Sequence, residues 1–326
     1  MKSVFYLLFL LAIACVGCKK DNHSSNPPNN TDPVWLVYNK NNAPLPHNQI
    51  NALAIDQQDI KWIGTAEGLC KLKQSTWTIY DMGNSPLPSS FVRTIAVEKD
   101  GMIWVGTDKG LASYDGTEWK VYTKANSVMT DNGIMCIAYD AVRQCTWVAT
   151  EKELIRIDGS NNWQRFDAIE DDLILSMAVD NKGALWLGTF HHFSFRGRIR
   201  KFSDNQWTSF HLDQMGYAST FPYSLAIDKQ NKLFAVLTGT SVKSVICFSG
   251  SSWQEIPGPP EAAGLKALLL DQDKVWVGGN ALSLFGSTQW SIVSLPGGVS
   301  GIQAMALDSK QKKWLGTIDG GVVVYK

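Results

Sequence analysis

The chain has 326 residues, of which 44% are hydrophobic and 18% are charged, so it is long and apolar enough to bury a large core. This composition excludes intrinsic disorder for most of the chain. The 30 Lys and Arg residues balance 30 Asp and Glu residues, and a zero net charge lacks the basic footprint of nucleic-acid-binding proteins, so we expect no nucleic-acid partner.

Residues 1–17 have the features of a signal peptide for export. A lysine precedes an apolar run that ends at Gly17, which is too short to span a bilayer comfortably but matches a signal-peptide core. Gly17 directly before Cys18, and the polar residues after it, resemble a bacterial lipoprotein processing site. The resemblance implies lipidation of Cys18, with Cys15 as the alternative position. We therefore expect an exported protein, lipid-anchored to the bacterial outer membrane on its periplasmic or surface face.

Residues 18–33 continue as KKDNHSSNPPNNTDP after the cysteine, without a large apolar side chain. Such a segment has nothing to bury, and it predicts a flexible polar tether. No second apolar stretch of 18 or more residues follows, so we expect membrane contact through the lipid anchor only. Residues 34–326 remain for the folded domain.

Beyond residue 34 the sequence is a repeat in which a Trp-x-Gly-Thr motif recurs every 38 to 48 residues. The motif, or the position equivalent to it, begins at Trp62, Trp104, Trp147, Trp186, Phe234, Trp276 and Trp314. A second series stands at Trp35, Trp77, Trp119, Trp163, Trp207, Trp253 and Trp290. The two series account for all 13 Trp residues, so we interpret the indole rings as core rather than as a binding site.

Each unit contains four short strand patterns. An Ile-x-x-Ile run such as Ile50–Ile55 is followed by Trp-x-Gly-Thr, then by Gly-Leu, and finally by Trp-x-x-Tyr or Trp-x-x-Phe. Four strands in about 40–45 residues are typical of a propeller blade. We predict an all-β fold, a seven-bladed β-propeller of four-stranded antiparallel blades. The last unit stops after its third strand, so the N-terminal segment 35–38 is expected to complete the last blade and close the ring.

The segment 98–111, EKDGMIWVGTDKGL, carries the motif most completely. It resembles the two-component regulator propeller repeat. The resemblance implies a propeller that acts as an extracytoplasmic sensor, often of polysaccharide breakdown products. The chain departs from the family's usual arrangement because no transmembrane helix and no kinase follow its single propeller, so we expect a stand-alone lipoprotein without phosphotransfer. The unit of Phe234 departs too, because it lacks the Trp-x-Gly-Thr pattern.

Acidic and cysteine residues are the first candidates for chemistry. One acidic residue ends the first strand of each unit, at Asp56, Glu98, Asp140, Asp180, Asp228, Asp271 and Asp308. The symmetry of a ring keeps these carboxylates apart, so we interpret them as turn residues that accept backbone N–H groups. We predict free thiols at Cys70, Cys136, Cys145 and Cys247, which form no C-x-x-C pair. We expect no metal site and no cofactor.

Two insertions break the repeat, and we predict the ligand-binding site there. The connection after Thr189 is lengthened to residues 190–198, and the connection 213–223 before the fifth unit is also long. Loops that join second to third strands share a face with loops that enter the next blade, so the insertions should lie side by side, where rigid scaffolds carry function. The predicted site residues are His191, His192, Phe193, Phe195, Arg196, Arg198, Tyr217, Phe221 and Tyr223.

Other roles for these insertions stay open. Neighbouring His191 and His192 point opposite ways in an extended chain, which disfavours a shared metal. Acid–base catalysis by either histidine needs a carboxylate partner, which Glu151 or Asp213 could supply. Hairpin elaboration without a function is a further interpretation.

We expect a non-catalytic recognition module, a monomer whose partner is a carbohydrate, such as a glycan fragment, or an envelope protein. A propeller-type polysaccharide lyase or another carbohydrate-active enzyme is the alternative, and a structural scaffold of an envelope complex is the second alternative. An enzyme would need a compact cluster of His, Tyr and acidic residues. A scaffold would expose an apolar patch.

Overall fold

The computed structural model describes residues 35–326 except 160–161, 167–171, 240–242, 260–263 and 287. The predicted signal peptide 1–17, the tether 18–33 and the lipidation candidates Cys15 and Cys18 lie outside the described residues. Among the residues that are described, no helix has the length and apolar character that crossing a membrane requires.

The described residues form 28 strands in seven four-stranded antiparallel sheets, and these sheets are the blades of a propeller. The first strands of blades one to seven are β2 (Ile50–Ile55), β6 (Val92–Val97), β10 (Ile134–Asp140), β14 (Asp172–Val179), β18 (Thr220–Ile227), β22 (Ala267–Asp271) and β26 (Ile302–Leu307). The second strands are β3 (Lys61–Thr65), β7 (Ile103–Thr107), β11 (Cys145–Thr150), β15 (Leu185–His191), β19 (Leu233–Gly239), β23 (Lys274–Gly278) and β27 (Lys313–Thr317).

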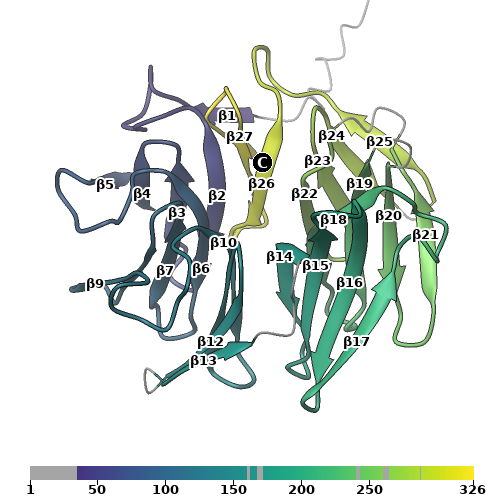
Figure 1. The fold of residues 1–326 in the computed structure, drawn as a ribbon. Helices are drawn as coiled ribbons and strands as arrows, with labels where there is room; N and C mark the ends of the chain where they lie inside the picture. The colour runs from purple at the N-terminus through teal and green to yellow at the C-terminus, as the bar shows by residue number, and fades with distance from the viewer. Residues whose placement is uncertain (1–34, 160–161, 167–171, 240–242, 260–263, 287) are drawn as a thin grey trace, which may run out of the picture. The chain divides into compact units, whose positions relative to one another are not determined.

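The outer half of each blade continues in the same order. The third strands are β4 (Gly68–Lys73), β8 (Leu111–Tyr114), β12 (Leu154–Asp158), β16 (Arg196–Ser203), β20 (Lys243–Phe248), β24 (Leu282–Phe285) and β28 (Val322–Tyr325). The fourth strands are β5 (Thr76–Tyr80), β9 (Trp119–Tyr122), β13 (Asn162–Phe166), β17 (Gln206–His211), β21 (Trp253–Pro257), β25 (Trp290–Val293) and β1 (Trp35–Tyr38). In Figure 1 the first strands stand toward the middle, and fourth strands such as β5 and β17 lie outside.

The first strands contact one another in sequence around the ring, from β2 to β26 and back to β2. The ring is closed by the N-terminal strand, because β1 pairs antiparallel with β28 in blade seven, with Trp35 opposite Tyr325. The rings of these two residues lie 5.0 Å apart, and the ring of Tyr38 stacks on that of Trp314 at 6.0 Å. The predicted seven-bladed propeller and its mode of closure are confirmed.

The acidic residue at the end of the first strand fastens the turn to the core. In blade seven Asp308 Oδ1 accepts the backbone N–H groups of Lys310 and Lys312, both at 2.9 Å. Its other oxygen, Oδ2, accepts the indole N–H of Trp314 at 3.0 Å. Asp56 and Asp180 repeat this arrangement in blades one and four. The carboxylate therefore satisfies a buried indole as well as the turn, a role that the sequence interpretation did not include.

The glycine of Trp-x-Gly-Thr lies against the first strand of the next blade. A Cβ built on Gly64 would lie 2.5 Å from Val92 Cγ1, and one on Gly106 would lie 2.5 Å from Ile134 Cγ2. Gly316 in blade seven meets Ile50 of blade one in the same way, at 2.6 Å. Because protein interiors are close-packed, a methyl group at these positions would push neighbouring blades apart.

The four cysteines of the described chain are free thiols, as predicted. Burial raises the pKa of Cys70 to about 12 and is also the largest cause that raises the pKa of Cys145 to about 12. Since the thiolate is the reactive form, these thiols are held protonated and inert at neutral pH.

We expect Gly106→Ala to destabilise the propeller by about 1–3 kcal/mol, because the added methyl group would meet Ile134 and Thr94 inside contact distance. Denaturant unfolding followed by tryptophan fluorescence measures the change.

The control is Gly297→Ala, where an added Cβ would meet nothing within 4 Å. We expect the control to change the free energy of unfolding by less than about 0.5 kcal/mol. Equal stability of the two variants would contradict the close approach between blades.

Candidate functional site

The first insertion is a long hairpin rather than a loop. The ladder between β15 and β16 continues past Thr189, with Phe190 opposite Gly197 and His191 opposite Arg196. Only residues 192–195 form the turn, so the expectation of a loop over 190–198 is wrong for most of that segment. The turn is held at its base, where the N–H of Phe195 donates to the carbonyl of His191 at 3.0 Å. The turn is thus carried at the end of a paired two-stranded ladder.

The hairpin contacts the second insertion, the connection between β17 and β18. The rings of Phe190 and Phe221 meet edge to face with their centroids 4.5 Å apart. Arg196 Nη1 lies 3.2 Å from Asp213 Oδ2 in an ion pair. The two insertions therefore lie side by side, as the order of strands predicted.

The tip of the hairpin exposes aromatic rings. Phe193 is 75% exposed and Phe195 is 62% exposed. Phe195 also has a φ of 53°, in the left-handed region that a bulky side chain seldom adopts. His191 and His192 lie beside the ring of Phe193, with centroids 6.2 and 5.5 Å from it. Four predicted site residues thus gather at the tip of the hairpin.

Two predicted site residues face elsewhere. Arg198 pairs with Asp172 at 3.2 Å, and the side chain of Asp172 is fully buried, with Arg200 3.7 Å away. The hydroxyl of Tyr217 donates to Glu255 Oε2 at 3.1 Å. Both polar groups are engaged within the protein, so the structure does not bring Arg198 or Tyr217 to the hairpin tip.

The carboxylates considered as partners for a catalytic histidine are also engaged. Glu151 Oε1 accepts from Arg93 Nη1 at 3.2 Å, and Asp213 pairs with Arg196. His191 Nδ1 accepts the backbone N–H of Ser194 at 3.1 Å. Among the described residues neither carboxylate bonds to His191, although Asp213 Oδ1 has no hydrogen-bond partner there.

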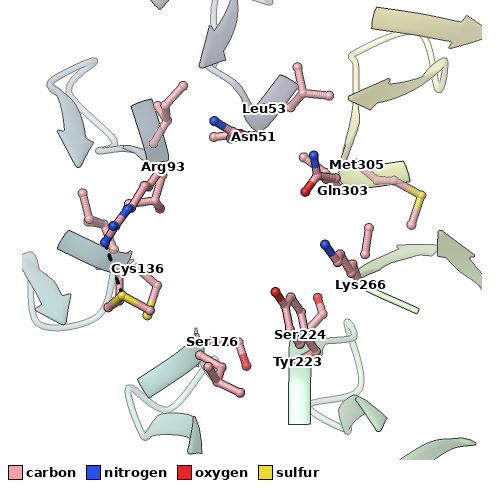
Figure 2. A pocket seen from close by; sticks show the side chains of 18 of the residues that line it. Asn51, Leu53, Arg93, Cys136, Ser176, Tyr223, Ser224, Lys266, Gln303 and Met305 are labelled. Carbon is pink, nitrogen blue, oxygen red and sulfur yellow. Dashed lines mark hydrogen bonds between the residues drawn. The ribbon is translucent and has the colours of Figure 1, made fainter. Parts of the chain in front are cut away.

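Tyr223 belongs to a different feature, a cavity of about 590 Å³ between the first strands. Every blade contributes residues to its lining, and Figure 2 shows their side chains arranged around an open space. We call this cavity the channel. Phe221 lies two residues before Tyr223 on β18, so this strand links the hairpin to the channel.

A repeated irregularity in the first strands supplies the channel with side chains. In six blades the pairing of the first strand with the second skips one residue, which is a β-bulge. The skipped residues are Asn51, Arg93, Met135, Leu175, Tyr223 and Gln303, and all of them line the channel. Lys266 stands in the equivalent place before β22 of blade six. These seven residues are called the bulge ring below.

The sequence interpretation missed the bulge ring except for Tyr223. Its signal was present, because these residues occupy the first variable position of the Ile-x-x-Ile run, where neighbouring units carry Asn, Arg, Met, Leu, Tyr, Lys and Gln. The flanking positions of the run are mostly apolar in every unit, whereas this position changes its residue type from unit to unit, so it has no common packing role. Charged and amide side chains at Arg93, Lys266 and Gln303 should therefore have been counted as candidates.

The charges in the channel are positive. Lys266 Nζ lies 5.8 Å from the centroid of the Tyr223 ring, a cation–π distance. Arg93 is partly neutralised by Glu151 and also contacts Met135 Sδ at 3.5 Å. No Asp or Glu lies among the described residues that line the channel. In the same part of the chain, no group of three or more His, Cys, Asp or Glu side chains is placed to hold a metal ion.

Comparison with known families agrees with the repeat pattern. Residues 86–109 match the profile of the two component regulator propeller, and this segment forms part of the second blade of the ring. The resemblance to this repeat family is confirmed. No curated protein sequence matches the chain.

Solved structures with this architecture include lyases and extracellular domains of putative two component systems. A streptogramin B lyase has a TM-score of 0.75 at 12% identity, covering 90% of this chain and 98% of the lyase. Virginiamycin B lyase from Staphylococcus aureus, solved in a catalytically inactive form with quinupristin, has a TM-score of 0.73 at 13% identity, covering 90% and 99% of the two chains. The extracellular domain of a putative hybrid two component system from B. thetaiotaomicron has a TM-score of 0.71 at 15% identity, covering 86% of this chain and 40% of that one. At these identities the likeness establishes the fold.

Burial, followed by the nearby charge of Glu255 and the bond to it, raises the pKa of Tyr217 to about 12. The ordinary tyrosine pKa of about 10 applies to the unfolded chain, so the contribution of Tyr217 to stability is present below about pH 10 and is lost as the pH rises toward 12. We expect Glu255→Gln to lower the pKa of Tyr217 without returning it to 10, since burial remains. Titration of the tyrosine Cζ resonances by NMR measures both values.

Exposed Glu118 provides the control, and Glu118→Gln should leave the pKa of Tyr217 unchanged. A wild-type Tyr217 that titrates near 10 would contradict the contact with Glu255.

Proposed function

We propose that this chain, a propeller with two-component regulator repeats, is a non-catalytic recognition module that binds oligosaccharide fragments. The binding surface is the face that carries the blade-four hairpin and the adjoining mouth of the channel. Saccharides present both apolar ring faces and many hydroxyl groups, so a surface of exposed aromatic rings beside polar groups suits them.

The observation that carries the proposal is Phe195. Its ring is 62% exposed, and its φ of 53° is unfavourable for a bulky residue. Neither burial nor local backbone preference accounts for a phenylalanine at this position. A role in contacting a partner accounts for the exposed ring, because a ring carried on a paired hairpin contacts a ligand with little loss of entropy.

Aromatic contacts connect the hairpin with the channel. The ring of Phe195 lies 5.7 Å from that of Phe190, which in turn lies 4.5 Å from Phe221. Two residues further along β18, Tyr223 lines the channel. A ligand that stacks on the hairpin is thereby led toward the polar groups at the channel mouth, which supports a single extended binding surface.

Proteins of the same fold support ligand binding by such a ring. The Staphylococcus aureus virginiamycin B lyase was solved with quinupristin, and YCF48 was solved bound to a D1 peptide, at 15% identity and a TM-score of 0.66 to this chain. The fold therefore accepts a small molecule in one protein and a peptide in another. An envelope-protein segment is the alternative partner for this chain, and the experiment below separates the two.

The test uses the variant Phe193→Ala/Phe195→Asn, in which Asn suits the left-handed backbone. Calorimetric titration measures binding to a panel of xylo-, cello-, arabino-, galacto- and galacturono-oligosaccharides. We expect at least one of these to bind wild type and to bind the variant roughly tenfold more weakly, because two aromatic stacks contribute about 0.5–1.5 kcal/mol each. The melting temperature should stay close to that of wild type, since both rings are exposed.

Val142→Ala is the matched control, because Val142 is 55% exposed in the β10–β11 turn at the other end of the first strands. It should leave saccharide binding unchanged. Equal affinity of wild type and the tip variant would contradict the binding surface. If none of the oligosaccharides binds wild type, the proposed oligosaccharide binding would be contradicted and the envelope-protein partner would be favoured.

We also propose that Cys18 holds the module at the bacterial outer membrane through a lipid anchor, as the Gly17–Cys18 sequence indicates. Two or more acyl chains give stable anchoring, since each buried CH₂ contributes about 0.8 kcal/mol. Cys18→Ala should move the protein from the membrane fraction to the soluble fraction, whereas Cys15→Ala should not. Immunoblots of fractionated cells measure the distribution, and a Cys18→Ala protein that remains acylated would contradict the assignment.

A further inference from the structure

We infer that the channel mouth is a subsite for the carboxylate of an acidic sugar, so that the module selects uronate-containing oligosaccharides over neutral ones. This inference rests on the proposed function and names its ligand class. Three side chains of the bulge ring form the subsite: Lys266, Gln303 and Tyr223.

Two of these side chains carry N–H donors for which the described residues show no side-chain hydrogen bond or ion pair. Gln303 Nε2 is buried, and it has no hydrogen-bond partner among the described residues. Lys266 is half-buried and pairs with no acidic side chain in the part of the chain that the structure describes. A buried donor without a partner costs stability, and so does a partly desolvated charge. An anionic acceptor in the channel would compensate the charge of Lys266, and a turn of the Gln303 amide group would bring Nε2 to the same acceptor.

The three side chains converge from neighbouring blades. Tyr223 belongs to blade five, Lys266 precedes the first strand of blade six, and Gln303 belongs to blade seven. Figure 2 shows all three pointing into the same open space, with the ammonium group of Lys266 between the amide of Gln303 and the ring of Tyr223. The Lys266 Nζ to ring-centroid distance of 5.8 Å keeps the ammonium group over the ring rather than in bulk solvent.

The opposite side of the bulge ring offers no equivalent group. Arg93 pairs with Glu151, so its charge is already partly compensated. Asn51 donates through Nδ2 to the carbonyl of Val92 at 2.9 Å and accepts from Gln49 Nε2 at 2.9 Å. The uncompensated positive charge therefore lies on the side of blades five to seven.

The size of this charge selects the kind of anion. One lysine balances a carboxylate of charge −1, whereas a phosphate monoester carries about −1.5 to −2 at neutral pH. The aromatic rings of Phe190, Phe195 and Phe221 contact one another and reach β18, the strand of Tyr223, so they suit further sugar rings of the same oligosaccharide. An oligosaccharide with a uronate residue matches both parts, with its carboxylate at Lys266 and its ring faces on the hairpin.

The test compares a galacturonic acid tetrasaccharide with its carboxyl-reduced form, the corresponding galactose tetrasaccharide. The two probes differ only in charge and in the carboxyl oxygens. Calorimetric titration at low salt should show the acidic probe binding tenfold to a hundredfold more tightly than the neutral probe. The reason is that a hydrogen bond between charged groups is stronger than one to a neutral hydroxyl group. The preference should shrink as the ionic strength rises.

Lys266→Gln should abolish the preference, so that the acidic and the neutral probe bind this variant with similar affinity. Lys229→Gln is the matched control, since Lys229 is exposed in the β18–β19 turn at the other end of β18, the strand that carries Tyr223, and the change in net charge is the same. A second variant, Gln303→Glu, should weaken only the acidic probe, because it places a like charge in the subsite.

Equal binding of the two probes to wild type, or a preference that persists in Lys266→Gln, would overturn the carboxylate subsite and leave the saccharide function standing. Absence of binding to either probe and to the wider oligosaccharide panel would overturn the proposed function together with this inference. Preferential binding of an acidic hexapeptide, again dependent on Lys266, would overturn the assignment to a sugar. Protection of Lys266 from reductive methylation by the acidic probe, read by mass spectrometry, locates the bound carboxylate independently.

Discussion

Neighbouring blades of this propeller approach one another most closely where a second strand faces the first strand of the next blade. Gly64, Gly106, Gly278 and Gly316 leave out the methyl group that would collide with Val92, Ile134, Ile302 and Ile50 respectively. The equivalent residue is Ala149 in blade three and Val236 in blade five, and both are fully buried. The distance between neighbouring blades therefore varies around the ring, but the blades remain packed at every position. This contact between blades positions the first strands, and the first strands form the walls of the channel. The width of the channel, and with it the rest of the structure, therefore depends on the contact.

The same first strand performs two tasks with adjacent residues. In blade two, Val92 is fully buried against the preceding blade, and the next residue, Arg93, bulges out of the ladder into the channel. The bulge therefore separates packing from recognition, because the residue in the channel can change without altering the contact between blades. Six such bulges, together with Lys266 in the equivalent place of blade six, form a surface whose chemistry is independent of the core. In this chain that surface carries Lys266 and Gln303 on one side and a partly compensated Arg93 on the other.

The hairpin of blade four adds a second surface to the same face. Its base is fixed by the Phe190–Phe221 contact and the Arg196–Asp213 ion pair, so the exposed tip is held by two independent interactions. Phe221 is part of β18, the strand that also places Tyr223 in the channel. A single strand thus couples an aromatic platform to a cationic subsite, and this coupling underlies both the proposed function and the inferred preference for uronates.

The sequence by itself determined the strands, the number of blades, the closing strand and the free thiols. These properties follow from local patterns repeated seven times, and repetition makes each short signal unambiguous. Only the tertiary structure decided how individual side chains are used. Arg198 pairs with Asp172, 26 residues away, and Tyr217 with Glu255, 38 residues away, so the polar groups of both side chains are engaged within the protein. The bulge ring likewise exists only once seven separate strands meet around one axis. Partners that come from distant residues or neighbouring blades leave no local pattern, which is why the fold was predictable and the arrangement of the site was not.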